Sequence, residues 1–357
     1  MSDNVDVVNP KVRSVYWQYI RGICIIAVVL IHSKNGVQYD TGWMFGWNAG
    51  YWLVLRQLIN FPVAVFIFLA GYFTNIDDAL RNRRQYYSQR GQKLIVPFLI
   101  WSSFYTIINV AAAKGNVDIF RTLIKLFLGL SSGQLYYILV LIQLLLVTPV
   151  MIRMIQKQKY IKIMIAVTPI YPACIYVYAF VFKTQMPFYQ TFFPAWFIFY
   201  FAGLWIKIRG YIPVLKDNAL IKSILLCIAA LLLSVVEGLS MLAAGFNQEL
   251  AYSQIKVSSF LYTFALINFM FTVKQSYTVK ECKFLKILGD NSYGIYFVHC
   301  FWLTILNIGM RLIPVFENNL WLYQIVQAGS AIFLSWVCII IVRKILGSKI
   351  SGRLFGF

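Results

Sequence analysis

The chain has 357 residues, of which 60% are hydrophobic and 17% aromatic, and its mean hydropathy is +0.71. This composition excludes an ordinary soluble domain and indicates a polytopic membrane protein. The formal net charge is +20, from 32 Lys and Arg against 12 Asp and Glu. It does not indicate a nucleic-acid partner, because the basic residues concentrate in alternate loops between apolar runs.

Apolar runs long enough to cross a bilayer, which takes roughly 20 residues, predict about ten transmembrane helices. We expect them near residues 15–34, 52–74, 93–113, 134–152, 161–181, 192–209, 221–243, 255–273, 289–309 and 323–343. The distribution of Lys and Arg among the loops predicts that both termini are cytoplasmic. The predicted fold is an all-α bundle, a single transmembrane domain over residues 1–357 in a bacterial cytoplasmic membrane, with no soluble domain after the last helix.

The first apolar run carries two ionisable residues, Arg21 and His32, although charge within a membrane segment is costly. Eleven positions separate them, which is about 1100° of helical rotation, so both project from one face at a separation of roughly 16 Å. Such a face suits a long ligand held by its anionic end. Alternatively, Arg21 extends to the lipid headgroups and His32 packs against a neighbouring helix.

Two further charged residues fall within predicted helices. Arg56 lies in the outer half of the second helix, and Glu237 lies late in the seventh, at about the same depth. A charged side chain at that depth needs a partner, so we expect a salt bridge between them.

The loop between the second and third predicted helices is the most basic and contains Arg84 and Arg90. Arg90 and Lys93 are three positions apart, which places them on one side of the start of the third helix. Free backbone N–H groups at a helix start would help these side chains to bind phosphates. Ordinary anchoring of a cytoplasmic loop explains the same charges.

The remaining chemistry-bearing residues are few. An outward segment, 118–130, looks amphipathic and is expected on the membrane face. His299, the only other histidine, falls in the ninth predicted helix. None of the six cysteines has metal-ligand spacing, so we expect neither a metal site nor a disulfide framework.

Five pieces of sequence resemble, in order and over essentially the whole chain, the acyltransferase 3 family of integral membrane acyltransferases. They are the spacing of Arg21 and His32, FPVAVFIFLAGYF, RGQKLIVPFLIW, GQLYYILVLIQLLL and NSYGIYFVH. Members of this family acylate sugars outside the cytoplasm, with acyl-CoA as the donor. The resemblance implies that Arg21 and His32 are the essential pair, and that Arg90 and Lys93 occupy an Arg-x-x-Arg position. Lys93 keeps the charge there but lacks the bidentate guanidinium.

The resemblance and the residues together predict a membrane O-acyltransferase. It would move an acyl group, most simply acetyl from acetyl-CoA, to a hydroxyl of an exported polysaccharide such as O-antigen, capsule or exopolysaccharide. The CoA phosphates would meet Arg84, Arg90, Lys93 and Arg21. His32 would act as a general base or carry the acyl group as an acyl-histidine, while His299 would orient the acceptor or only pack.

Alternatives from other classes remain open at this stage. The main one is a transporter or flippase of a polysaccharide or lipid-linked sugar, although we find no internal repeat of the kind common in transporters. A polymerase usually has a long outward loop, and none here exceeds about 20 residues. A third alternative is a non-enzymatic partner protein in glycan synthesis or export. Beside the bilayer, the expected partners are acyl-CoA, a cell-surface glycan and such synthesis or export proteins.

Overall fold

The structure, a computed structural model, describes residues 15–33, 47–113, 117–157, 161–210, 214–316 and 319–357, and within these ranges it contains helices and no strand. The helices are α1 (Val15–His32), α2 (Trp47–Leu58), α3 (Pro62–Tyr72), α4 (Ile76–Arg81), α5 (Arg83–Ala112), α6 (Ile119–Phe127), α7 (Tyr136–Gln156), α8 (Ile161–Val167), α9 (Ile170–Phe182), α10 (Phe197–Arg209), α11 (Ala219–Ala243), α12 (Gln248–Ala251), α13 (Val257–Ser276), α14 (Lys283–Asp290), α15 (Ser292–Met310), α16 (Leu320–Leu346) and α17 (Ser348–Leu354).

Within the described residues, nine helical segments are long and apolar enough to cross a membrane. The all-α, polytopic membrane fold is thereby confirmed. The predicted span 192–209 differs from the others, because a short turn precedes α10 and leaves that helix only 13 residues, fewer than a crossing helix needs. α10 packs instead against α3 and α7 inside the bundle.

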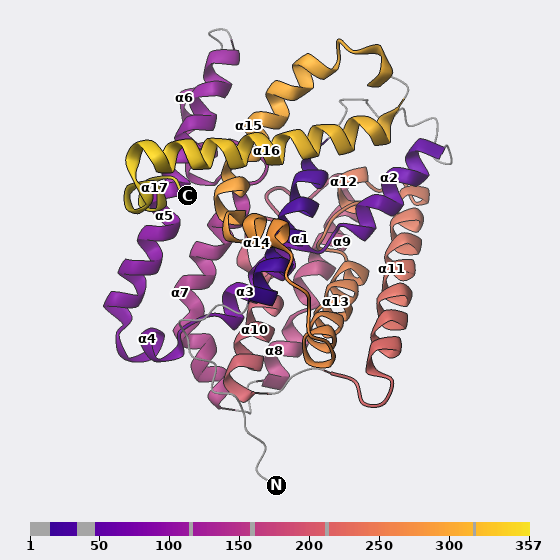
Figure 1. The fold of residues 1–357 in the computed structure, drawn as a ribbon. Coiled ribbons are helices and arrows are strands. Elements are labelled where there is room, and N and C mark those ends of the chain that lie inside the picture. Colours follow the sequence, from indigo (N-terminus) through magenta and orange to yellow (C-terminus); the bar gives the residue numbers. More distant parts are fainter. Residues whose placement is uncertain (1–14, 34–46, 114–116, 158–160, 211–213, 317–318) are drawn as a thin grey trace.

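α1 lies in the middle of the assembly, in contact with α3, α14, α15 and α16 (Figure 1). Its central residues Cys24, Ile25 and Val29 are completely buried. α16 crosses the front of the bundle in this view, at a steep angle to α11. The helix that carries Arg21 and His32 is therefore surrounded by other helices over most of its length.

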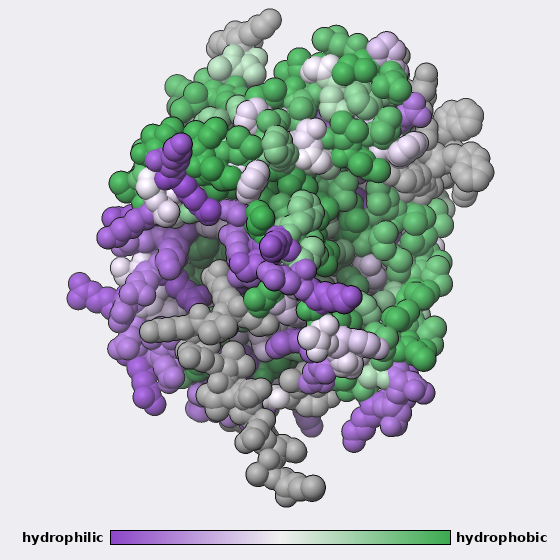
Figure 2. Space-filling view, viewed as in Figure 1, coloured by the Kyte–Doolittle hydropathy of each residue, from purple (hydrophilic) through white to green (hydrophobic). Residues whose placement is uncertain are grey.

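Hydrophobic residues cover the upper and right-hand parts of the same view, over α16 and α11, as a lipid-facing surface requires (Figure 2). Hydrophilic residues gather along the lower and left-hand edge, near α4 and the start of α5. α11 itself carries exposed apolar side chains, among them Leu225, Leu232 and Val236. The surface pattern thus agrees with the membrane fold.

The second predicted span is interrupted between α2 and α3. Pro62 begins α3, where its missing N–H costs nothing, but it cannot donate a hydrogen bond back to the end of α2. The carbonyl oxygen of Leu58, at the end of α2, accepts a hydrogen bond from the Tyr262 hydroxyl at 3.0 Å. The break is therefore satisfied by another helix, as backbone inside a membrane requires.

The third predicted span begins earlier than expected. α5 starts at Arg83 and continues to Ala112, so Arg90 and Lys93 lie within the helix and not at its start. Their backbone N–H groups belong to the helix, and the predicted contribution of a free helix N-terminus to phosphate binding at Arg90 and Lys93 is wrong.

Close helix pairs position the site. A Cβ atom on Gly22 of α1 would overlap the carbonyl oxygen of Leu285 in α14, and one on Gly203 of α10 would overlap that of Phe68 in α3. Glycine allows helix backbones to approach closely, which is a common basis of packing in membranes. The first contact holds α1 against α14, which leads directly into α15, and the second holds α10 against α3.

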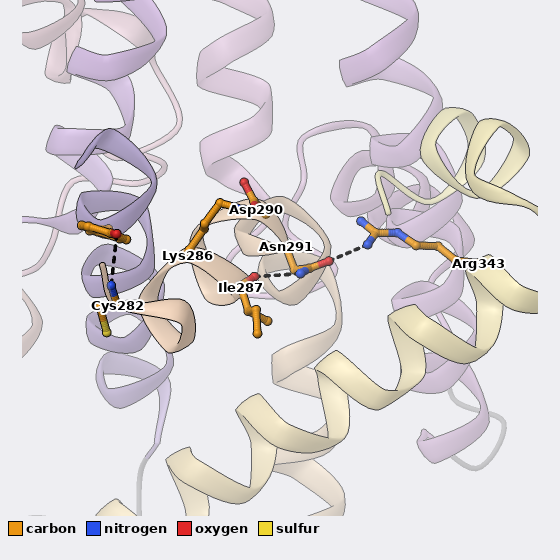
Figure 3. Close-up of polar contacts among 7 residues, drawn as sticks. Cys282, Lys286, Ile287, Asp290, Asn291 and Arg343 are labelled. Atoms are coloured by element: carbon orange, nitrogen blue, oxygen red, sulfur yellow. Dashed lines mark hydrogen bonds and ion pairs between the residues drawn. The ribbon is translucent and has the colours of Figure 1, made fainter. Parts of the chain in front are cut away.

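The junction of α14 and α15 is held by side-chain hydrogen bonds (Figure 3). Asn291 donates to the carbonyl oxygen of Ile287 at 2.7 Å and accepts from Arg343 of α16, also at 2.7 Å. Lys286 and Asp290 form an ion pair at 3.5 Å. Three helices thus meet where α15, the helix of His299, begins.

Candidate active site

A cavity of about 310 Å³ lies beside the C-terminal end of α1, and His32 forms part of its wall. Its lining is a mixture of aromatic, amide, hydroxyl and aliphatic groups from several segments. The residues are Val28, Ile31, His32, Trp52, Arg56, Val63, Gly133, Tyr136, Gln190, Gln248, Glu249, Tyr252, Ser253, Gln254 and Tyr296. Aromatic faces and amides side by side can hold a ligand that has both apolar faces and hydroxyl groups.

Gln254 is the clearest open hydrogen-bonding group in this wall. Its side chain is buried, and its Oε1 atom receives no hydrogen bond from the described part of the chain. Buried polar atoms are nearly always satisfied in native proteins. Within the described part of the chain, Gln254 is therefore an exception to this rule at a residue that lines the cavity.

The wall formed by residues 251–254 is held in place by two buried amides from the interrupted second span. Asn60 donates to the carbonyl oxygens of Tyr252 and Ser253, at 3.1 and 2.7 Å. Gln57 donates to that of Ala251 at 3.1 Å. Asn60, at the break between α2 and α3, thus binds two backbone carbonyls of residues that line the cavity.

His32 lies next to His299, with their ring centres 5.3 Å apart. Nδ1 of His299 is 3.1 Å from the carbonyl oxygen of Ile295, one turn earlier in α15. Because a carbonyl oxygen only accepts, this Nδ1 carries a proton. Nε2 is then the acceptor nitrogen, and it lies 3.4 Å from Sγ of Cys300.

The two histidines differ in their access to the cavity. His32 lines it and is partly exposed, whereas His299 is completely buried. Tyr296, also in the wall, lies between His299 and α7, with ring centres 5.8 Å from His299 and 5.1 Å from Tyr137. A ligand in the cavity can therefore contact His32, whereas His299 is not part of the cavity wall.

The opposite end of α1 has a cationic character. Cζ of Arg21 lies 5.4 Å from the centre of the Phe73 ring, and the Arg90 guanidinium donates to the Phe73 carbonyl oxygen at 3.4 Å. Two guanidinium groups from α1 and α5 thus meet at one residue at the end of α3. We call this end of the bundle the basic end, and the end with His32 the cavity end.

The family model described as an acyltransferase domain, that of acyltransferase 3, matches residues 14–340. The chain belongs to the acyltransferase 3 family. Comparisons with curated proteins and with solved structures gave no match. Membership makes the chain a membrane acyltransferase in general, and it favours this class over the transporter.

The cationic residues that the sequence predicts to bind the donor differ in their surroundings. Arg90 is half-buried against Phe73 and lies over the ring of Tyr86, 5.6 Å from its centre. Lys93 is exposed, and its backbone carbonyl accepts a hydrogen bond from Tyr293 at 3.1 Å. Arg84 is exposed near the start of α5. The structure therefore brings Arg90, but neither of the other two side chains, into contact with the residue that Arg21 touches.

Sequence reasoning missed Lys274, which lies near the end of α13. Its Nζ is 5.4 Å from the centre of the Trp17 ring, and that ring is 6.2 Å from the ring of Phe73. Lys274 thus adds a third cation to the basic end. Its sequence position gave no signal, since it is one of several lysines that follow the predicted eighth span.

The prediction of a salt bridge between Arg56 and Glu237 is wrong. Glu237 accepts hydrogen bonds from Tyr176 at 2.6 Å and from the backbone and side chain of Ser258. Arg56 and Glu237 both lie in the described part of the chain, and no ion pair joins them there. Arg56 lines the cavity instead. Equal depth did not mean contact, because neighbouring polar groups already satisfy the carboxylate of Glu237.

Lys256, just before α13, is a cation that the sequence reasoning assigned only to a loop. Its side chain is completely buried and donates to the carbonyl oxygen of Ser234 at 2.9 Å. Burial lowers the pKa of Lys256 from 10.5 to about 8, and the charge of Glu237 opposes this shift. Ser234 in turn donates to Gln57 at 2.7 Å, so Lys256 supports the wall of the cavity.

Proposed function

We propose that this membrane acyltransferase moves an acyl group, acetyl in the simplest case, from acyl-CoA in the cytoplasm to a hydroxyl of an exported polysaccharide. The observation that supports this proposal most directly is the position of the charged and titratable side chains along α1. His32 lines the cavity at one end, and Arg21 lies with Arg90 at the other. A donor with phosphates and a long flexible arm, and an acceptor with hydroxyl groups, fit the two ends respectively.

At the basic end, the phosphates of the donor bind Arg21, Arg90 and Lys274. Guanidinium groups form strong, charge-assisted hydrogen bonds with phosphate oxygens. The rings of Trp17 and Phe73 lie among these cations, and the partly exposed Phe73 offers an apolar face to the rest of the nucleotide. The inner-membrane location, with the basic end in the cytoplasm, is part of this proposal.

At the cavity end, the acceptor hydroxyl lies beside His32. In the direct route the imidazole takes the hydroxyl proton, the oxygen attacks the thioester carbon, the C–S bond breaks and the CoA thiolate leaves and is protonated. In the stepwise route the imidazole nitrogen attacks the thioester carbon, the C–S bond breaks and the CoA thiolate leaves and is protonated. The acceptor hydroxyl then attacks the acyl carbon, the bond between that carbon and the imidazole nitrogen breaks, and the hydroxyl proton passes to the freed imidazole. The ring of Tyr296 beside the cavity limits access of water, which otherwise hydrolyses the thioester.

The test is the acyl content of surface polysaccharide, measured by proton NMR in cells that lack the protein and in cells complemented with variants at matched membrane levels. Wild type restores an O-acyl signal and His32→Ala does not. Leu30→Ala is the control, since Leu30 is on the same helix but does not line the cavity. Equal acylation in all cells, with a changed amount of surface glycan, would replace this proposal with transport.

A further inference from the structure

The side chains of His32, His299 and Cys300 form a group with metal-ligand chemistry. One ligand atom from each lies within 4.8 Å of those of the other two. Neutral imidazole and thiolate are the preferred ligands of Zn²⁺ in proteins. The three residues come from two helices, and sequence spacing gave no sign of them, because His32 and His299 are 267 positions apart.

The geometry already fits a tetrahedral ion at two of the three positions. With Zn–N near 2.0 Å and Zn–S near 2.3 Å, neighbouring ligand atoms in a tetrahedral site are about 3.3–3.6 Å apart. Nε2 of His299 and Sγ of Cys300 are 3.4 Å apart. The ligand nitrogen of the partly exposed His32 lies within 4.8 Å of both of these atoms, so His32 is the ligand that has to move closer when the ion binds.

The surroundings of His299 also match those of a metal ligand. Ligating histidines usually donate their second ring N–H to a carbonyl or carboxylate oxygen, which fixes the tautomer and the ring. Nδ1 of His299 makes this contact with Ile295, which leaves Nε2 directed to Cys300. The hydrogen bond to the helix backbone thus leaves the lone pair of His299 Nε2 available to bind a metal.

We propose that His32, His299 and Cys300 form a Zn²⁺-binding site, and that Zn²⁺ bound there inhibits the acyltransferase. The cavity supplies the route of entry, since His32 is part of its wall. The Cys300 thiol loses its proton when it binds the metal. A water molecule in the cavity completes four-coordination.

The inhibition rests on the proposed function, because it arises from use of the His32 lone pair that either catalytic route requires. The binding does not rest on it. His32 cannot accept a proton or an acyl group at a nitrogen that is bonded to the metal. The two parts are therefore measured separately.

The binding experiment uses the purified full-length protein in detergent and Zn²⁺ alone, by isothermal titration calorimetry. We expect Cys300→Ala and His299→Ala to bind Zn²⁺ at least tenfold more weakly than wild type, because even an outer-shell partner of a metal ligand is worth 10- to 100-fold. Cys338→Ala is the matched control, since Cys338 is also half-buried but lies on α16. Thermal unfolding without metal confirms that each variant is folded. Equal affinities for wild type and Cys300→Ala, or no binding by wild type, would overturn the site.

The activity experiment adds Zn²⁺ to membranes that contain each variant. Wild type and Cys338→Ala should lose activity over the concentration range in which Zn²⁺ binds. Cys300→Ala, which retains His32, should keep its basal rate and require at least tenfold more Zn²⁺ for the same loss. Binding with the expected ligand dependence but an unchanged transfer rate would overturn the inhibition, and would show that the assignment of His32, not of the metal site, had failed.

Discussion

At the basic end of α1, Arg21 and Arg90 both contact Phe73, and Lys274 lies over Trp17. At the cavity end, His32 faces a wall that neutral amides hold in place through backbone carbonyls. Cations stacked on rings can exchange partners with an anionic ligand, whereas buried amide hydrogen bonds fix a shape. Changes at the basic end should therefore alter donor affinity, and changes at the cavity end should alter the chemical step or the stability of the wall.

The largest effect is expected for His32→Ala. Loss of a general base typically costs about 10²- to 10⁴-fold in rate, so kcat should fall by that amount while the KM for acyl-CoA changes little. The measurement is acyl transfer from labelled acyl-CoA in membranes with matched protein levels. A tenfold rise in KM with an unchanged kcat would place His32 in donor binding and remove the distinction between the two ends.

Arg90→Ala should produce the opposite pattern. Hydrogen bonds to charged groups contribute about 1.5–3 kcal/mol, so the KM for acyl-CoA should rise by about tenfold to a hundredfold with kcat largely retained. Arg84→Ala is the matched control, since this arginine is exposed on the same helix. If both variants raised KM equally, a diffuse basic surface, and not the cluster at Phe73, would bind the donor.

Asn60→Leu tests the wall. Its removal leaves the buried carbonyl oxygens of Tyr252 and Ser253 without these donors, and each such loss costs about 1–3 kcal/mol of the free energy of unfolding. Thermal unfolding in detergent should show the loss. Asn109→Leu, which removes one hydrogen bond to Ser131 from an exposed side chain, should cost less; an equal cost would show that the wall does not depend on the buried amide.

Most of the membrane-spanning helices could be predicted from the sequence, because the length of an apolar run and the positions of basic residues are local properties of the chain. The spacing of Arg21 and His32 also needed only one helix. The start of α5 and the interruption before Pro62 were missed, since apolar runs do not mark where backbone hydrogen bonds begin or end. The contacts of Glu237, and the approach of His32 to His299 and Cys300, were inaccessible because the partners come from different helices.

Lys256→Met should give the smallest effect, and one that depends on pH. The pKa of this buried lysine is lowered to about 8 from 10.5, so between these values the unfolded chain binds a proton that the folded chain does not. The contribution of Lys256 to the free energy of unfolding therefore rises with pH over this window, by less than about 1.4 kcal/mol per pH unit, and becomes constant below about pH 8, where both states hold the proton.

Unfolding of wild type and Lys256→Met, followed in detergent between pH 7 and pH 10, isolates that contribution, because all other titrating groups are common to both proteins. The stability of wild type relative to the variant should increase across the series. Lys207→Met, at an exposed lysine of α10, controls for the loss of one positive charge. Parallel curves for wild type and Lys256→Met would mean that Lys256 holds its proton equally in both states, and that the cavity wall contains a permanent buried cation beside Glu237.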